Sequence, residues 1–143
     1  MTVVPTALII TPSFFGYEKD MAAEFERQGY RTVVLDERPS NRAIARAVMR
    51  VRKDVMARQI QAYYERVVPD LERMPLDHIV VIKAEIVPRW FLQRLRRAHP
   101  SATMTFYTYD AIGNAGNCLD VLDLFDRTLS FDQTDVAHRP GLE

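Results

Sequence analysis

The chain has 143 residues, 48% of them hydrophobic and 27% charged, which is typical of one ordinary globular domain with its own core. Lys plus Arg and Asp plus Glu both number 19, so the formal net charge is zero and gives no overall preference for nucleic acid. The single cysteine excludes an internal disulfide, and no apolar stretch approaches the roughly 20 residues that a membrane span requires. Residues 1–6 lack the basic segment and cleavage site of a signal peptide, so we expect a cytoplasmic protein.

Five short apolar runs alternate with helical patterns along the chain. The apolar runs predict strands over about residues 7–11, 31–36, 77–83, 102–108 and 127–131. The helical patterns predict helices over about residues 18–28, 41–72 with a bend near 53–58, 88–99 and 118–125, and residues 138–140 are expected to open a further strand. Strand alternating with helix predicts an α/β fold, a Rossmann-like three-layer α/β/α domain with a parallel sheet of about five strands. We assign residues 1–141 to this single domain and interpret Leu142-Glu143 as a candidate cloning scar.

Each predicted strand ends in a cluster of polar and small residues. All strands of a parallel sheet point the same way, so these clusters are expected to meet along one edge, where open α/β sheets bind ligands. A carboxylate just past a buried strand can accept a hydroxyl proton, which makes Glu85 and Asp110 the candidate catalytic residues, with Asp110 preferred as the base. The candidate substrate-binding residues are Ser13, Gly16, Arg38, Lys83, Tyr109, Asn114 and Asp132.

Structural interpretations of the same residues stay open. Glu85 can instead cap the helix that follows it, and Asp110 can instead tie down the next loop. Arg38 can pair with Glu37 as an ordinary surface ion pair. Gly16 stands alone in the first loop, so the glycine fingerprint of dinucleotide-binding folds is absent and a nucleotide-binding oxidoreductase is a poor interpretation.

A basic run follows the second predicted strand. Arg42, Arg46 and Arg50 recur every four residues, which places them on one face of a helix. A solvated helix face explains this stripe simply, and the functional interpretation is contact with an anionic membrane surface or a lipid phosphate. No aromatic residues interleave with the run, which argues against nucleic acid. The three histidines lack metal-ligand spacing, so no metal site is predicted.

Six short motifs follow one another along the chain: Phe15-Gly16-Tyr17-Glu18, Asp36-Glu37-Arg38-Pro39-Ser40-Asn41, Ile82-Lys83-Ala84-Glu85, Tyr107-Thr108-Tyr109-Asp110, Phe125-Asp126-Arg127-Thr128-Leu129-Ser130-Phe131-Asp132 and Arg139-Pro140. Taken in order, they resemble the N-terminal domain of bacterial lipopolysaccharide or capsular polysaccharide biosynthesis proteins of the spore-maturation-like glycosyltransferase group. Ala84 stands where this family is expected to have glycine, and Tyr109 where it is expected to have tryptophan.

This resemblance implies a GT-B architecture in which the chain supplies the acceptor side of the cleft. A sugar or lipid-linked acceptor would bind here, and the nucleotide-sugar donor would bind a missing C-terminal domain. The isolated domain would hold no cofactor and would not be active alone, and its location would be cytoplasmic, peripheral at the inner membrane. The alternative is a non-catalytic flavodoxin-like or receiver-like module that binds a ligand or partner. The receiver version is weakened because the first strand lacks the acidic pair expected at its end.

Overall fold

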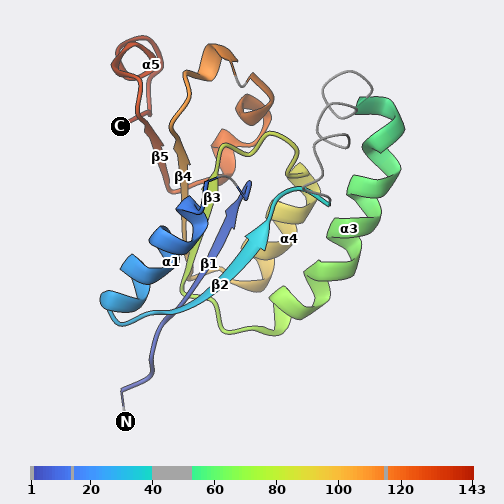
Figure 1. Cartoon of the computed structure of the whole chain (residues 1–143), viewed down its shortest axis with the longest axis vertical. Helices are drawn as coiled ribbons and strands as arrows, with labels where there is room; N and C mark the ends of the chain where they lie inside the picture. The colour runs from blue at the N-terminus through green and yellow to red at the C-terminus, as the bar shows by residue number, and fades with distance from the viewer. Residues whose placement is uncertain (1, 14, 40–52, 115) are drawn as a thin grey trace.

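The computed structural model describes residues 2–13, 15–39, 53–114 and 116–143, arranged as a sheet with helices on both faces (Figure 1). The strands are β1 (Thr6–Thr11), β2 (Arg31–Asp36), β3 (His78–Ile82), β4 (Thr103–Thr108) and β5 (Arg127–Ser130). The α-helices are α1 (Tyr17–Arg27), α3 (Lys53–Arg73), α4 (Arg89–Ala98) and α5 (Gln133–His138). Three short 3-10 helices, η1 (Ile112–Asn114), η2 (Gly116–Asp120) and η3 (Leu122–Leu124), connect β4 to β5.

All pairings of these five strands are parallel, and their order is β2-β1-β3-β4-β5. The predicted α/β fold with about five parallel strands is therefore confirmed, and the order is the flavodoxin-like one. The order reverses between β1 and β3, which are direct neighbours. Loops from opposite sides of the sheet diverge at such a reversal, and the crevice between them is where doubly wound folds bind ligands.

The core lies between the sheet and the pair α3 and α4. Every residue of β1 is buried, as expected for a central parallel strand with both faces covered. Tyr64 of α3 and Phe91 of α4 are fully buried and lie 4.7 Å apart between ring centroids, in one cluster with Leu8 and Ile10 of β1. Helix α1 packs against β1 and β2 on the opposite face of the sheet (Figure 1).

Helix α3 runs through Pro69 to Arg73, and the burial of Val68 and Leu71 against the core offsets the hydrogen bond that proline cannot make. One local expectation differs from the structure. The chain after β5 forms α5 before any strand, because the carboxylate of Asp132 accepts a hydrogen bond from the N–H of Thr134 and caps that helix.

The last residues return to the sheet. Leu142 forms a parallel bridge with Thr128 of β5. The N–H of Glu143 donates to the carbonyl of Thr128, and the carbonyl of Glu143 accepts a hydrogen bond from the N–H of Ser130. The strand expected to open at residues 138–140 is not formed there: His138 ends α5, and the return to the sheet is the isolated bridge at Leu142.

Gly29 ends α1 in the left-handed region, with φ of 92°. Replacing it with alanine is expected to lower the free energy of unfolding by about 1 kcal/mol, because a Cβ is disfavoured at this φ. No atom lies within 4 Å of the added Cβ, so a steric clash does not contribute. Urea unfolding measures the change, with Gly113→Ala as the matched control, since that glycine has equal space and no positive φ.

Candidate functional site

Charged side chains from three loops meet at the carboxyl edge of the sheet. Lys83, directly after β3, places its Nζ 2.6 Å from Oδ2 of Asp110, which follows β4. The same Nζ lies 3.1 Å from Oε1 of Glu85, and Oε2 of Glu85 accepts a hydrogen bond of 2.8 Å from Nη2 of Arg38. We call Arg38, Lys83, Glu85 and Asp110 the edge network. It links the loops after β2, β3 and β4 through alternating cations and carboxylates.

An unusual turn sets the direction of the Lys83 side chain. The N–H of Ala84 donates to the carbonyl of Ile82 at 2.8 Å, and φ of Lys83 is 67°, which together describe a γ-turn of the rare, strained kind. Ala84 also has a positive φ of 53° and is buried. The N–H of Lys83 still pairs with the carbonyl of Tyr107, so the turn begins directly at the end of the β3–β4 ladder. Strain of this sort persists where surrounding contacts hold it, and here the ammonium group is tied to two carboxylates.

Two members of the edge network, Lys83 and Glu85, have pKa values shifted in the direction that favours their charged forms. Burial lowers the pKa of Lys83, but hydrogen bonds to Asp110 and Glu85 outweigh it and leave that pKa above the ordinary value of 10.5. Burial raises the pKa of Glu85, but Lys83 and Arg38 outweigh it and leave that pKa below 4.5. The Lys83 side chain is only 13% exposed, so salt screens its interactions less than those of a surface lysine.

A second carboxyl group, Glu37, lies completely buried beside the network. Neither of its carboxylate oxygens makes a well-formed hydrogen bond within the described part of the chain, although the backbone of Glu85 lies close enough to act on the carboxyl group. Burial and the negative charge of Glu85 raise its pKa from 4.5 to about 8, although Arg38, the Glu85 backbone and Lys83 act in the opposite direction. A pKa of about 8 leaves most of the Glu37 carboxyl groups protonated at pH 7, unlike that of Glu85.

Two tyrosines of α3 fix the loop that carries Glu37. The hydroxyl of Tyr64 donates to the carbonyl of Glu37, and that of Tyr63 donates to the carbonyl of Asp36, both at 2.6 Å. Since α3 is anchored in the core, these two hydrogen bonds hold the end of β2 and the start of the following loop against α3.

Removing the buried hydroxyl should weaken this anchor. Tyr64→Phe is expected to lower the free energy of unfolding by about 1 kcal/mol, because the Glu37 carbonyl then loses its partner in a dry site. Tyr63→Phe is the control and should cost less, because Tyr63 is only partly buried and water can replace its hydroxyl. If chemical denaturation gives the same decrease in the free energy of unfolding for both variants, the burial of the Tyr64 hydroxyl does not determine its contribution.

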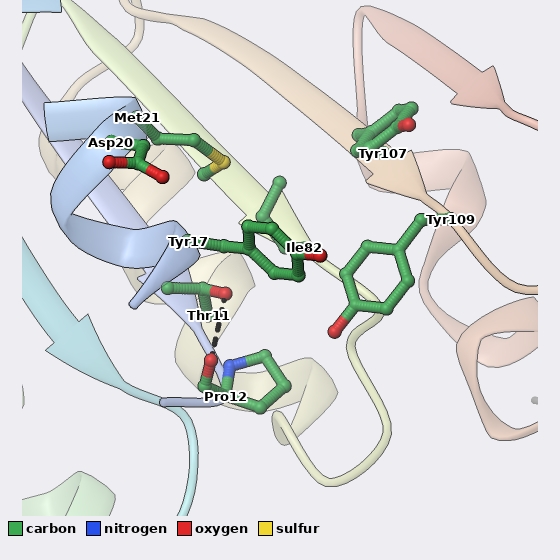
Figure 2. Close-up of a pocket in the computed structure, with 8 residues that line it drawn as sticks. All are labelled: Thr11, Pro12, Tyr17, Asp20, Met21, Ile82, Tyr107 and Tyr109. Carbon is green, nitrogen blue, oxygen red and sulfur yellow. Dashed lines mark hydrogen bonds between the residues drawn. The ribbon is translucent and has the colours of Figure 1, made fainter. Parts of the chain in front are cut away.

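A pocket of about 330 Å³ opens beside the edge network. It spans the reversal in strand order, since it touches the ends of both β1 and β3. Figure 2 shows the ring of Tyr17, from the start of α1, facing that of Tyr109, which follows β4, with Tyr107 of β4 farther away. The rings of Tyr17 and Tyr109 lie 6.4 Å apart at 59°, and Nζ of Lys83 lies 5.1 Å from the centroid of the Tyr109 ring. The lining residues of this tyrosine pocket are Thr11, Pro12, Tyr17, Asp20, Met21, Ile82, Tyr107 and Tyr109.

The candidate residues from the sequence fall into two groups. Arg38, Lys83, Glu85 and Asp110 form the edge network, and Tyr109 lies against it. Ser13 lies in the loop after β1, Gly16 starts α1 with φ of 79°, Asn114 ends η1, and Asp132 caps α5. The stripe of Arg42, Arg46 and Arg50 lies outside the described residues, so its proposed contact with an anionic surface stays a prediction.

Sequence reasoning missed three residues of this region. Glu37 is interpreted there only as a member of a local charge cluster, although it is the carboxyl group with the most perturbed pKa at the edge. Tyr17 lines the pocket without having been a candidate, and Tyr107 is considered in the sequence only as an alternative to Tyr109 for stacking on a sugar. The position of Tyr107 near the end of a predicted strand could have indicated that it lies at the ligand-binding edge. Nothing in the sequence indicates that Glu37, the residue after β2, is buried.

Comparison with known proteins supports the fold and corrects the family. No family model matches the chain, and no curated protein matches it. A signal receiver domain of an HD domain-containing protein from Pseudomonas fluorescens Pf-5 matches 96% of this chain and 85% of its own, at 10% identity and a TM-score of 0.54. A response regulator protein from Burkholderia pseudomallei, solved with a phosphorylated aspartic acid, calcium ion and citrate, matches 92% of this chain at 12% identity and a TM-score of 0.52. The match spans 64% of that second protein, so this chain corresponds to less than two thirds of its length.

The expected glycosyltransferase family is therefore wrong. The two solved structures described above share the fold and are a receiver domain and a response regulator, not glycosyltransferase domains. The motifs that suggested polysaccharide biosynthesis lie at strand ends, which any parallel α/β sheet has. The same finding favours the receiver-like module that the sequence left as the alternative. The comparisons do not test the catalytic role expected for Glu85 and Asp110, which stays a prediction. In the structure Glu85 contacts Lys83 and Arg38, and Asp110 contacts Lys83.

Two further findings concern only the part of the chain that the structure describes. None of its helices has the length and apolarity needed to cross a membrane. Within the same residues, His, Cys, Asp and Glu side chains do not gather in a group of three or more that could hold a metal ion.

Proposed function

We propose that this chain is a receiver-like binding module in which an internal lysine, Lys83, neutralises the carboxyl edge of the sheet. The observation that carries the proposal is the position of its Nζ, between Asp110 at 2.6 Å and Glu85 at 3.1 Å. The module acts by contact with a ligand or partner at this edge and not by becoming phosphorylated there. Cys118 is a buried free thiol, which suits the reducing cytoplasm where we place the protein.

The charge arrangement supports this assignment. A similar fold can hold a phosphorylated aspartate together with calcium, as in the protein from Burkholderia pseudomallei. Such chemistry needs carboxylate oxygens that are open to a divalent cation. In this chain the carboxylates of Glu85 and Asp110 already contact Lys83, and Glu37 is mostly protonated at neutral pH. A divalent cation at this edge would have to displace the ammonium group from both carboxylates.

Incubation with acetyl phosphate and Mg²⁺, followed by intact mass measurement, tests the proposal. We expect no gain of a phosphoryl group, whereas a phosphorylatable receiver domain run in parallel should gain one. A phosphoryl group mapped by peptide mass analysis to an aspartate of the carboxyl edge would refute the proposed function. Asp132→Asn is the control variant for phosphorylation outside the carboxyl edge, because Asp132 caps α5 and is not part of the edge network.

A further inference from the structure

We infer that the tyrosine pocket is a binding site for a small organic cation of the quaternary ammonium class, such as the trimethylammonium group of choline. This inference rests on the proposed binding role of the carboxyl edge and names the chemistry of its ligand. It draws on the shape of the pocket, the nature of its walls and the charge at its rim.

The walls form an aromatic corner of suitable size. Tyr17 and Tyr109 approach with ring centroids 6.4 Å apart and planes 59° apart, so a group seated in the corner can lie within about 6 Å of both rings. Tyr107 adds a third ring from β4, and Figure 2 shows Ile82 behind the rings and Met21 beside Tyr17. A volume of about 330 Å³ admits a small ligand of this kind but not a dinucleotide.

The charge of the lining favours a cation over an anion. Asp20 on α1 is the charged side chain among the described lining residues, and neither lysine nor arginine joins it. Aromatic faces attract cations because their electrostatic potential is negative. The largely apolar walls suit a methylated ammonium group, which loses little hydration on entry, better than a strongly hydrated primary ammonium group.

The ammonium group of Lys83 already lies against the Tyr109 ring, but it lies outside the pocket. The charge of that ammonium group is offset by Asp110 and Glu85, so it does not leave a net positive field at the pocket. The part of Tyr109 that faces the cavity stays available to a ligand.

Titration with choline, followed by the chemical shifts of backbone amides, tests the site. We expect a dissociation constant of about 1 mM, with shifts at Tyr17, Ile82 and Tyr109. The neutral isostere 3,3-dimethyl-1-butanol has the same shape without the charge and should bind at least tenfold more weakly. Tetramethylammonium should bind like choline, since the methylated cation is the recognised group, and a trimethyllysine peptide tests whether the group can also arrive on a protein.

Matched variants assign the binding to the pocket. Tyr109→Leu and Tyr17→Leu should each weaken choline binding about tenfold, and Asp20→Asn severalfold. Asp70→Asn is the acidic control on the exposed face of α3 and should leave binding unchanged. Tyr17 is 56% exposed, so its variant should fold even if Tyr109→Leu does not. Equal binding of choline and the neutral isostere, or undiminished binding by the folded Tyr17→Leu protein, would overturn the inference. Phosphoryl labelling would instead overturn the proposed function, so the two failures are distinguishable.

Discussion

Glu37→Gln is expected to make the protein more stable than wild type above pH 8, by up to roughly 5 kcal/mol. The unfolded carboxyl group ionises near 4.5, whereas the folded one holds its proton until about pH 8. Unfolding therefore releases a proton between these values, so the contribution of Glu37 to stability is fully present below pH 4.5 and is lost as the pH rises to 8. Glutamine has the same shape and does not ionise, so its contribution does not change over this range.

Urea unfolding of both proteins between pH 4.5 and 9 measures this effect. The two free energies of unfolding should be similar at the acid end and should separate steadily as the pH rises. Glu65→Gln is the control, because Glu65 is exposed on α3 and its removal should not alter the pH dependence. Parallel curves for Glu37→Gln and wild type would mean that Glu37 is ionised in the folded protein.

Lys83→Met should lower the free energy of unfolding by about 2 kcal/mol and create a response to Ca²⁺. Methionine keeps the length of the side chain and meets the same backbone strain as lysine, so the variant isolates the loss of charge. Glu85 and Asp110 then face each other without the ammonium group that both contact. Carboxylate oxygens are ligands that Ca²⁺ prefers, so the ion should bind the variant and recover part of its stability.

Thermal unfolding with and without 5 mM Ca²⁺, roughly the range of weak protein sites, tests this prediction. The melting temperature of Lys83→Met should rise on addition of Ca²⁺, and that of wild type should stay constant. Lys19→Met is the matched control, because Lys19 is exposed on α1. The same rise in the melting temperature of wild type would mean that Lys83 does not compete with Ca²⁺ for the carboxylates. No rise in Lys83→Met would mean that Glu85 and Asp110 do not lie close enough together to bind the ion.

Most of the fold could be predicted because its signals are local. Apolar runs such as Leu8–Ile10 need two buried faces, and that requirement alone predicts a central parallel strand. The meeting of Lys83, Glu85 and Asp110 follows from parallel strands, since residues just past β3 and β4 must share one edge. Strand order was not predicted, because the sequence does not state which strands are neighbours.

The family and the finer site required the structure. The resemblance to polysaccharide biosynthesis proteins came from strand-end motifs, which report the sheet and not the chemistry. Whether a carboxylate is open or paired depends on contacts across the fold, such as Arg38 to Glu85, which lie 47 residues apart. The same holds for Glu37, whose raised pKa is a consequence of complete burial, and for Tyr17, which joins the pocket through its ring contact with Tyr109 in the loop after β4.

The ammonium signal of Lys83 in a ¹⁵N NMR spectrum tests the central claim most directly. The chain has three lysines, so assignment by single substitution is simple. An ammonium group held by two carboxylates exchanges its protons slowly, so its signal should be visible at pH 7 and should shift or vanish in Asp110→Asn. A Lys83 signal that is lost to exchange in wild type, or that Asp110→Asn leaves unchanged, would contradict the account.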